Sequence, residues 1–185
     1  MSMNIVDEQL EMLKRVREEI PELIYLGDPI LRLKAQEVDQ SEGVSIANRL
    51  VDVLSRYREL TGVGRGFAAP QIGECKAVFV LYLEDFEVFI NPKILESSPQ
   101  SNYYRELCLS SGVLWADVKR PEWVKLEWTT IEGELISRRF EGIQARIVQH
   151  EFDHLQGIVN LDRAEPGSIE FVGESVWDQK LRLAN

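Results

Sequence analysis

The two histidines of this chain stand four residues apart, and their spacing constrains the fold more than any other feature. The sequence contains only His150 and His154, and Glu151 directly follows the first of them. Residues four apart on an α-helix differ by about 40° around its axis, so both imidazoles can bind one metal ion while Glu151 lies beside it as a base. Apolar residues recur at helical spacing from Ile143 to Leu155. The pattern predicts a helix that carries part of a metal site, and the alternative is a buried helix with two incidental histidines.

A third metal ligand has to come from elsewhere in the chain. A catalytic site needs three protein ligands and one open position for water. Because there is no further histidine, the third ligand must be a cysteine or a carboxylate. Cys108 is one candidate, and the carboxylates that follow the histidine helix, Glu165, Glu170 and Glu174, are the others. The residue types alone leave both possibilities open.

Hydrophobic periodicity predicts the other elements of the fold. Helices are expected over residues 7–20 and 45–60, and strands over residues 76–84, 86–91, 123–131 and 134–140. The links between strands are short, which favours antiparallel pairing. We therefore expect an α+β fold in which a mostly antiparallel β-sheet packs around the central HExxH helix, with an additional N-terminal helix.

Charge and composition exclude several classes of protein. The net charge of −10 argues against a nucleic-acid-binding surface, because phosphate contacts need clustered Lys and Arg, so no direct DNA binding is expected. No apolar run is long enough to span a bilayer, and no membrane association is expected. Acidic residues interrupt residues 1–20, unlike a signal or transit peptide, which predicts a cytoplasmic location.

Three short segments resemble motifs of the peptide deformylase family. Residues 64–71 read Gly-Arg-Gly-Phe-Ala-Ala-Pro-Gln, similar to the family's Gly-x-Gly-Leu-Ala-Ala-Pro-Gln. Residues 106–110 read Glu-Leu-Cys-Leu-Ser, which resembles Glu-Gly-Cys-Leu-Ser, and residues 149–154 match Gln-His-Glu-x-Asp-His. Three motifs in this order are more specific than one, and the resemblance extends over residues 24–162.

The resemblance implies a metal-dependent hydrolase that removes the formyl group from N-formylmethionyl nascent peptides and releases formate. It implies that Cys108, His150 and His154 hold one divalent metal ion, natively Fe²⁺, with Zn²⁺ or Ni²⁺ as alternatives. Thiolate and imidazole ligands suit both iron and zinc, so the donor set does not choose between them.

Catalytic roles also follow from the resemblance. Glu151 is expected to accept a proton from the attacking water and deliver it to the departing amine. The side-chain amide of Gln71 and the backbone N–H of Leu109 are expected to stabilise the oxyanion.

Residues beside the glycine and cysteine motifs are expected to bind the substrate. They are Gly64, Arg65, Gly66, Glu106, Leu107 and Arg120. Glu106 and Arg120 are expected to form an ion pair next to the cysteine, and the alternative is an exposed surface pair. Leu107 stands where the family has Gly, and Arg65 occupies a usually apolar position. These two departures predict that methionine is accepted less readily than in a typical deformylase.

We expect a single peptide-deformylase-like domain over residues 1–185, with an N-terminal helical extension at 1–22 and a C-terminal extension at 163–185. The expected partners are the N-formylmethionyl peptide and the ribosome during translation. Two alternatives remain open. One is a zinc metallopeptidase with a downstream Glu as third ligand, and the other is a divergent, catalytically weak deformylase-like binding protein.

Overall fold

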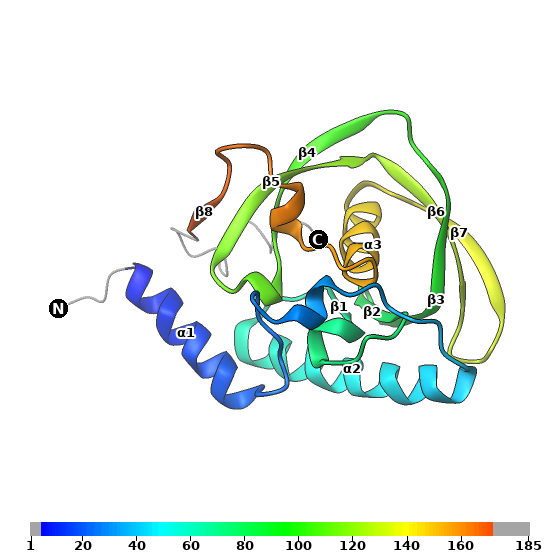
Figure 1. The fold of residues 1–185 in the computed structure, drawn as a ribbon, viewed down its shortest axis with the longest axis horizontal. Coiled ribbons are helices and arrows are strands. Elements are labelled where there is room, and N and C mark those ends of the chain that lie inside the picture. The colour runs from blue at the N-terminus through cyan, green and yellow to red at the C-terminus, as the bar shows by residue number, and fades with distance from the viewer. Residues whose placement is uncertain (1–4, 172–185) are drawn as a thin grey trace.

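A helix enclosed between two antiparallel sheets dominates the computed structural model, which describes residues 5–171 (Figure 1). The α-helices are α1 (Ile5–Glu19), α2 (Gln40–Thr61) and α3 (Gly142–Leu155). The strands are β1 (Gly66–Ala68), β2 (Val78–Tyr82), β3 (Phe86–Ser97), β4 (Ser101–Leu107), β5 (Leu114–Pro121), β6 (Trp123–Thr129), β7 (Leu135–Glu141) and β8 (Glu170–Phe171). The expected α+β class is confirmed.

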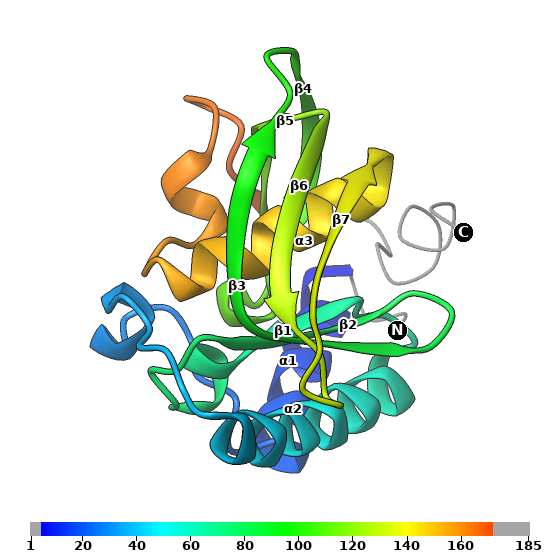
Figure 2. The same ribbon diagram turned by 90° about the vertical axis from the view of Figure 1, so that its right-hand side faces the viewer.

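The two sheets are separate and lie on different sides of α3 (Figure 2). The larger sheet has the strand order β1-β2-β3-β6-β7, and the smaller one has the order β4-β5-β8. Each neighbouring pair of strands is antiparallel. The larger sheet packs one face against α3, and its β1–β2 end packs the other face against α2. β1 is therefore an edge strand close to both helices.

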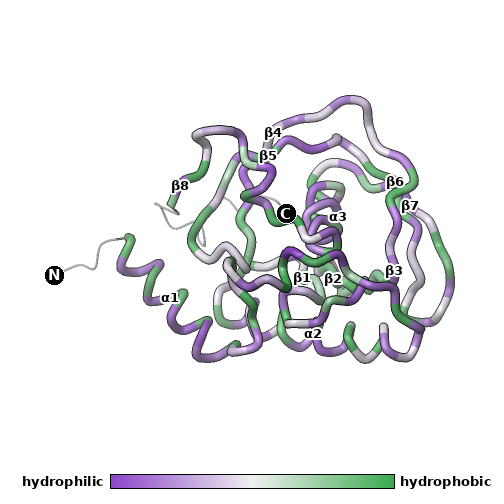
Figure 3. The backbone as a smooth tube through the Cα atoms, viewed as in Figure 1, coloured by the Kyte–Doolittle hydropathy of each residue, from purple (hydrophilic) through white to green (hydrophobic). Residues whose placement is uncertain are grey.

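α2 covers the outer side of β1 and β2, and α1 packs against α2. Hydrophilic and hydrophobic positions alternate along both helices, as expected for helices that bury one face (Figure 3). Asp39 caps the start of α2 by accepting a hydrogen bond from the backbone N–H of Glu42, and Gly62 ends the helix in the left-handed conformation, with φ of 76°. Among residues 5–171, no helix combines the length and hydropathy needed to cross a membrane.

β3 is longer than its hydrophobic pattern predicts. The expected strand stops at Asn91, before Pro92, but β3 continues to Ser97 after shifts in its register with β6. Asn91 has a positive φ of 51°, and its side chain hydrogen-bonds both the N–H and the C=O of Val38. A proline is tolerated at such an irregularity because its missing N–H breaks no regular ladder bond.

Candidate metal centre

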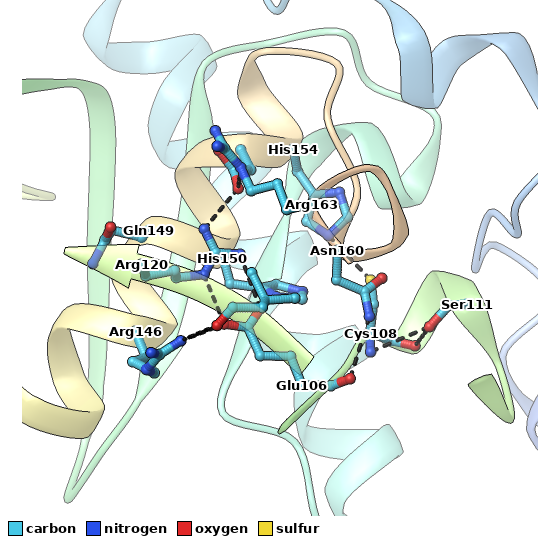
Figure 4. Close-up of polar contacts among 12 residues, drawn as sticks. Glu106, Cys108, Ser111, Arg120, Arg146, Gln149, His150, His154, Asn160 and Arg163 are labelled. Carbon is cyan, nitrogen blue, oxygen red and sulfur yellow. Dashed lines mark hydrogen bonds and ion pairs between the residues drawn. The ribbon is translucent and has the colours of Figure 1, made fainter. Parts of the chain in front are cut away.

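Cys108, His150 and His154 lie together between the small sheet and α3 (Figure 4). α3 presents the two histidines on one face, with ring centroids 5.2 Å apart, and Cys108 follows the end of β4. The Sγ of Cys108 is 3.2 Å from Nε2 of His154, and one ligand atom from each of the three residues lies within 4.8 Å of the others. The cluster is the one group of three such donors among residues 5–171.

The chemistry of these three residues fits a divalent metal ion. Bonds of about 2.0–2.3 Å from a tetrahedral ion place neighbouring ligand atoms about 3–4 Å apart, close to the observed spacing. Burial alone raises the pKa of the Cys108 thiol, but the positive field of His154 and His150 outweighs burial and holds that pKa well below its usual value. The thiolate is the form that binds metals. The cluster thus consists of the two helical histidines and a cysteine whose surroundings favour the thiolate form.

The rival carboxylate ligands lie elsewhere in the described structure. Glu165 accepts a hydrogen bond from Tyr103, and Glu170 forms an ion pair with Arg105. Glu174 lies outside the described residues. Neither described carboxylate belongs to the cluster of Cys108 and the histidines.

Glu106 fixes the orientation of His150. Its Oε2 lies 3.0 Å from Nδ1 of His150, while Nε of Arg120 donates to its Oε1 at 2.7 Å. Burial alone raises the pKa of Glu106, but hydrogen bonds with His150 and Arg120 overcome it and bring the pKa to about 2. Because an ionised carboxylate only accepts hydrogen bonds, Nδ1 of His150 carries the proton and Nε2 is left for a metal.

Arg120 lies behind the metal cluster and not on its open side. It is 3% exposed, and its guanidinium also donates to Asp153 at 2.7 Å, from the same helix as the histidines. The pair with Glu106 is therefore buried and not a surface pair. The expectation that Arg120 binds substrate needs correction, because its side chain is enclosed by Glu106 and Asp153 and does not line the cavity.

A cavity of about 270 Å³ opens beside the cluster. It is lined by all the other residues expected to contact substrate or transition state: Gly64, Arg65, Gly66, Gln71, Glu106, Leu107, Leu109 and Glu151. His150 also lines it, so a molecule in the cavity can approach the metal ligands. Residues distant in the sequence thus converge on one site.

Comparisons with known proteins agree with this geometry. Residues 20–169 match the family model for polypeptide deformylase. The chain is 36% identical over 143 residues to a peptide deformylase of Thermotoga neapolitana, covering 76% of this chain and 84% of the relative. It is 38% identical over 146 residues to a peptide deformylase of Dictyoglomus turgidum, covering 78% and 93%. This chain belongs to the peptide deformylase family.

Solved structures of deformylases share the fold. The crystal structure of a peptide deformylase from Synechococcus elongatus in complex with actinonin superposes with a TM-score of 0.70 at 34% identity, covering 78% of this chain and 79% of the other. The peptide deformylase of Thermotoga maritima gives a TM-score of 0.67 at 33% identity, covering 78% and 97%. Members of this family are enzymes that use a divalent metal, which agrees with the Cys/His/His cluster.

Part of the cavity is lined by α3 residues that lie outside the three sequence motifs. Ile143, Arg146 and Ile147 line it one and two helical turns before His150. Their spacing of three, four and seven residues from His150 was the signal that could have identified them. Nη1 of Arg146 donates to Glu106 at 3.2 Å, so its charge is already paired.

Gln71 and Glu151 are both held beside β1 and both line the cavity. The Oε1 of Gln71 accepts a hydrogen bond from Ala68 N–H at 2.9 Å, and its Nε2 donates to Ser110 Oγ at 3.1 Å. Oε2 of Glu151 has no protein partner, and burial raises the pKa of this carboxyl to about 7. A Cβ atom on Gly66 would lie 2.6 Å from Cδ of Glu151. Only glycine at position 66 leaves room for the carboxyl in this place.

The Gly66→Ala substitution is expected to lower kcat by about ten- to a hundredfold, because the added methyl group pushes the Glu151 carboxyl out of its position. Metal content, measured on the same sample, should stay near that of the parent, because the three atoms nearest to an added Cβ all belong to Glu151. Unchanged turnover would contradict the close contact between Gly66 and Glu151.

Replacing Arg120 with methionine is expected to reduce the free energy of unfolding by about 3 kcal/mol, because it leaves buried Glu106 and Asp153 with fewer donors. Denaturant unfolding at equal metal loading measures the change. The matched control is Arg49→Met, since Arg49 pairs with Glu74 at the surface and should contribute less than about 1 kcal/mol. Equal effects of the two variants would show that the Arg120 pairs contribute no more than a surface pair.

Proposed function

We propose that this chain hydrolyses the formyl amide of N-formylmethionyl peptides, with Cys108, His150 and His154 as ligands of one divalent ion and Glu151 as the group that moves the proton. The observation that carries the proposal is the position of the cluster and of the buried Glu151 carboxyl at the same cavity. Membership of the deformylase family supports the same reaction.

The substrate backbone is proposed to lie along β1. This strand is at the edge of the larger sheet, and Gly64 and Gly66 present no side chains to an approaching peptide. An extended peptide can add to such an edge through backbone hydrogen bonds. The formyl group then reaches the end of the cavity where His150 and Glu151 lie.

A bound divalent ion would act as a Lewis acid and lower the pKa of a coordinated water. Glu151 accepts a proton from the attacking water and delivers it to the amide nitrogen, as a new C–O bond forms and the C–N bond breaks. The products are formate and a free N-terminal amine. Gln71 Nε2 donates to Ser110 Oγ and also contacts Cys108 Sγ at 3.7 Å, so it lies beside the metal ligands, where it and the Leu109 N–H would stabilise the charge on the formyl oxygen.

Formate release from formyl-Met-Ala-Ser by protein loaded with Fe²⁺ under anaerobic conditions tests this function. We expect formate release at less than about 10 s⁻¹, because Leu107 and Arg65 are expected to disfavour methionine. A rate of about 10 s⁻¹ or faster would show that these two departures are neutral. Absence of formate from protein that contains one metal ion per chain would favour the deformylase-like binding protein.

Ferrous iron is the native ion that we propose. Iron-loaded protein is then expected to lose activity in air, because both Fe²⁺ and the Cys108 thiolate oxidise. Nickel- or zinc-loaded protein, treated in parallel, should lose its activity more slowly, because only the thiolate can oxidise there. Iron-loaded protein that stays active in air for days would argue for another native ion. Since the substrates emerge from ribosomes, we place the reaction in the cytoplasm, and contact with the ribosome remains a prediction.

A further inference from the structure

The cavity has two chemically different walls, one on each side of β1. Successive side chains of a strand point to opposite faces. Gly66 faces Glu151 on α3, whereas Phe67 packs into the core cluster that contains α2. The residue before Gly66, Arg65, therefore belongs to the α2 side, and it lines the cavity there with Arg58 from the last turn of α2.

The α3 wall is apolar or internally neutralised. Ile143 and Ile147 supply apolar surface, and the guanidinium of Arg146 on this wall is paired with Glu106. An uncharged side chain such as that of methionine fits this wall. Beside the two isoleucines, a charged side chain would lose its contact with water without gaining an ion pair.

The α2 wall carries the positive charge of Arg58, and among the described residues no carboxylate pairs with this charge. Its guanidinium donates to the C=O of Gly64 at 2.5 Å and lies over the ring of Tyr82, 3.7 Å from the centroid. Neither contact removes the charge. Arg105, which also lines the cavity, differs because Asp117 and Glu170 pair with it. In a protein with a net charge of −10, this wall is locally cationic.

In a substrate strand beside β1, successive side chains face different walls of the cavity. If the first residue, methionine, places its side chain against α3, the second residue must point to the α2 side. Glu106 and Glu151 also line the cavity, but they belong to the α3 side, because Glu106 contacts His150 of α3 and Glu151 is itself an α3 residue that faces Gly66. The second side chain thus meets Arg58.

We propose that this deformylase selects formylated peptides with an acidic second residue, and that Arg58 is the specificity-determining residue. The inference rests on the proposed function. Arg58 also donates a hydrogen bond to the Gly64 carbonyl, so the same side chain positions the chain before β1 and interacts with the second substrate side chain.

Formyl-Met-Glu-Ala and formyl-Met-Gln-Ala test the proposal, because Glu and Gln have nearly the same shape and differ in charge. We expect kcat/KM to be about three- to fivefold higher for the Glu peptide at low salt, the range of a solvent-exposed ion pair. The ratio should approach one in about 1 M salt, where such pairs are screened. Formyl-Met-Lys-Ala should be the poorest of the three.

Variants of α2 assign the effect to one side chain. Arg58→Gln should bring the Glu-to-Gln ratio to about one, even if loss of the Gly64 contact slows both peptides, whereas Arg58→Lys should keep a ratio above one. The matched control is Arg49→Gln, which removes one positive charge from the same helix outside the cavity and should leave the ratio unchanged. Equal values for the two peptides with the parent protein, or a ratio that survives in Arg58→Gln, would overturn the proposal.

A binding measurement separates this inference from the proposed reaction. Dissociation constants of both peptides for the metal-loaded Glu151→Gln variant, measured by calorimetry, should show the same three- to fivefold preference. Formate release with no preference in rate or binding would reject the specificity alone. Binding preference without formate release by the parent protein would reject the proposed reaction and keep the acidic specificity.

Discussion

Replacing Cys108 with alanine is expected to reduce bound divalent metal from about one ion per chain to nearly none, and to lower the metal affinity by at least about 100-fold. Two imidazoles remain in the variant, but a stable site of this kind needs three protein ligands. Formate release should fall to background at the same time. Metal content after dialysis, followed by titration with a competing chelator, measures both quantities.

The other cysteine provides the control for this experiment. Cys75 is partly exposed, and its sulfur lies near the carbonyl of Lys34, away from the histidines. Cys75→Ala should keep full metal content and turnover. If Cys108→Ala also bound one ion with parental affinity, Cys108 would not be a ligand, and a carboxylate would have to take its place.

The Glu151→Gln variant is expected to bind metal normally but to lose about a thousandfold in kcat, within the range of 10²–10⁴ that general acid–base catalysis contributes. Glutamine has nearly the same shape as glutamate, so the packing against Gly66 is preserved. Its amide cannot accept the proton of water and return it to the leaving amine. Single-turnover formate release measures the chemical step directly.

Glu165→Gln is a matched control, because the Glu165 carboxylate accepts a hydrogen bond from exposed Tyr103 and does not line the cavity. It should turn over at the rate of the parent protein. A Glu151→Gln variant with kcat within a few fold of the parent would contradict the role assigned to Glu151, and reduced metal content in that variant would point to an indirect effect on the ligands.

Local patterns predicted the elements that bury one face evenly. The apolar spacing over residues 142–155 predicted α3, and alternation over residues 123–140 predicted the β6–β7 hairpin. β4 and β5 had no comparable prediction over their full lengths. Most of β4 is exposed, so its sequence around Tyr103 and Tyr104 shows little alternation between apolar and polar residues. The hydrophobic pattern of a strand is informative only where one of its faces is buried.

Several features of the site depend on packing that no local pattern records. Arg120 was expected near the substrate because it stands close to the cysteine motif, yet packing placed it between Glu106 and Asp153. Arg58 was absent from the expected site although it stands six residues before Gly64, because only the folded chain turns its side chain back onto the Gly64 carbonyl. Both outcomes follow from how α2 and α3 lie against the sheets.

The sequence by itself determined the helical pair of His150 and His154 with Glu151 beside them, because an i,i+4 spacing sets the geometry of side chains on any helix. It left the third ligand open between a cysteine and a carboxylate. Tertiary structure alone brings a third donor to the pair, since it places Cys108 against His154 across 46 residues and Glu106 against His150 across 44. Such contacts arise when separate elements bury their apolar faces together, and the chain between them does not specify the distance.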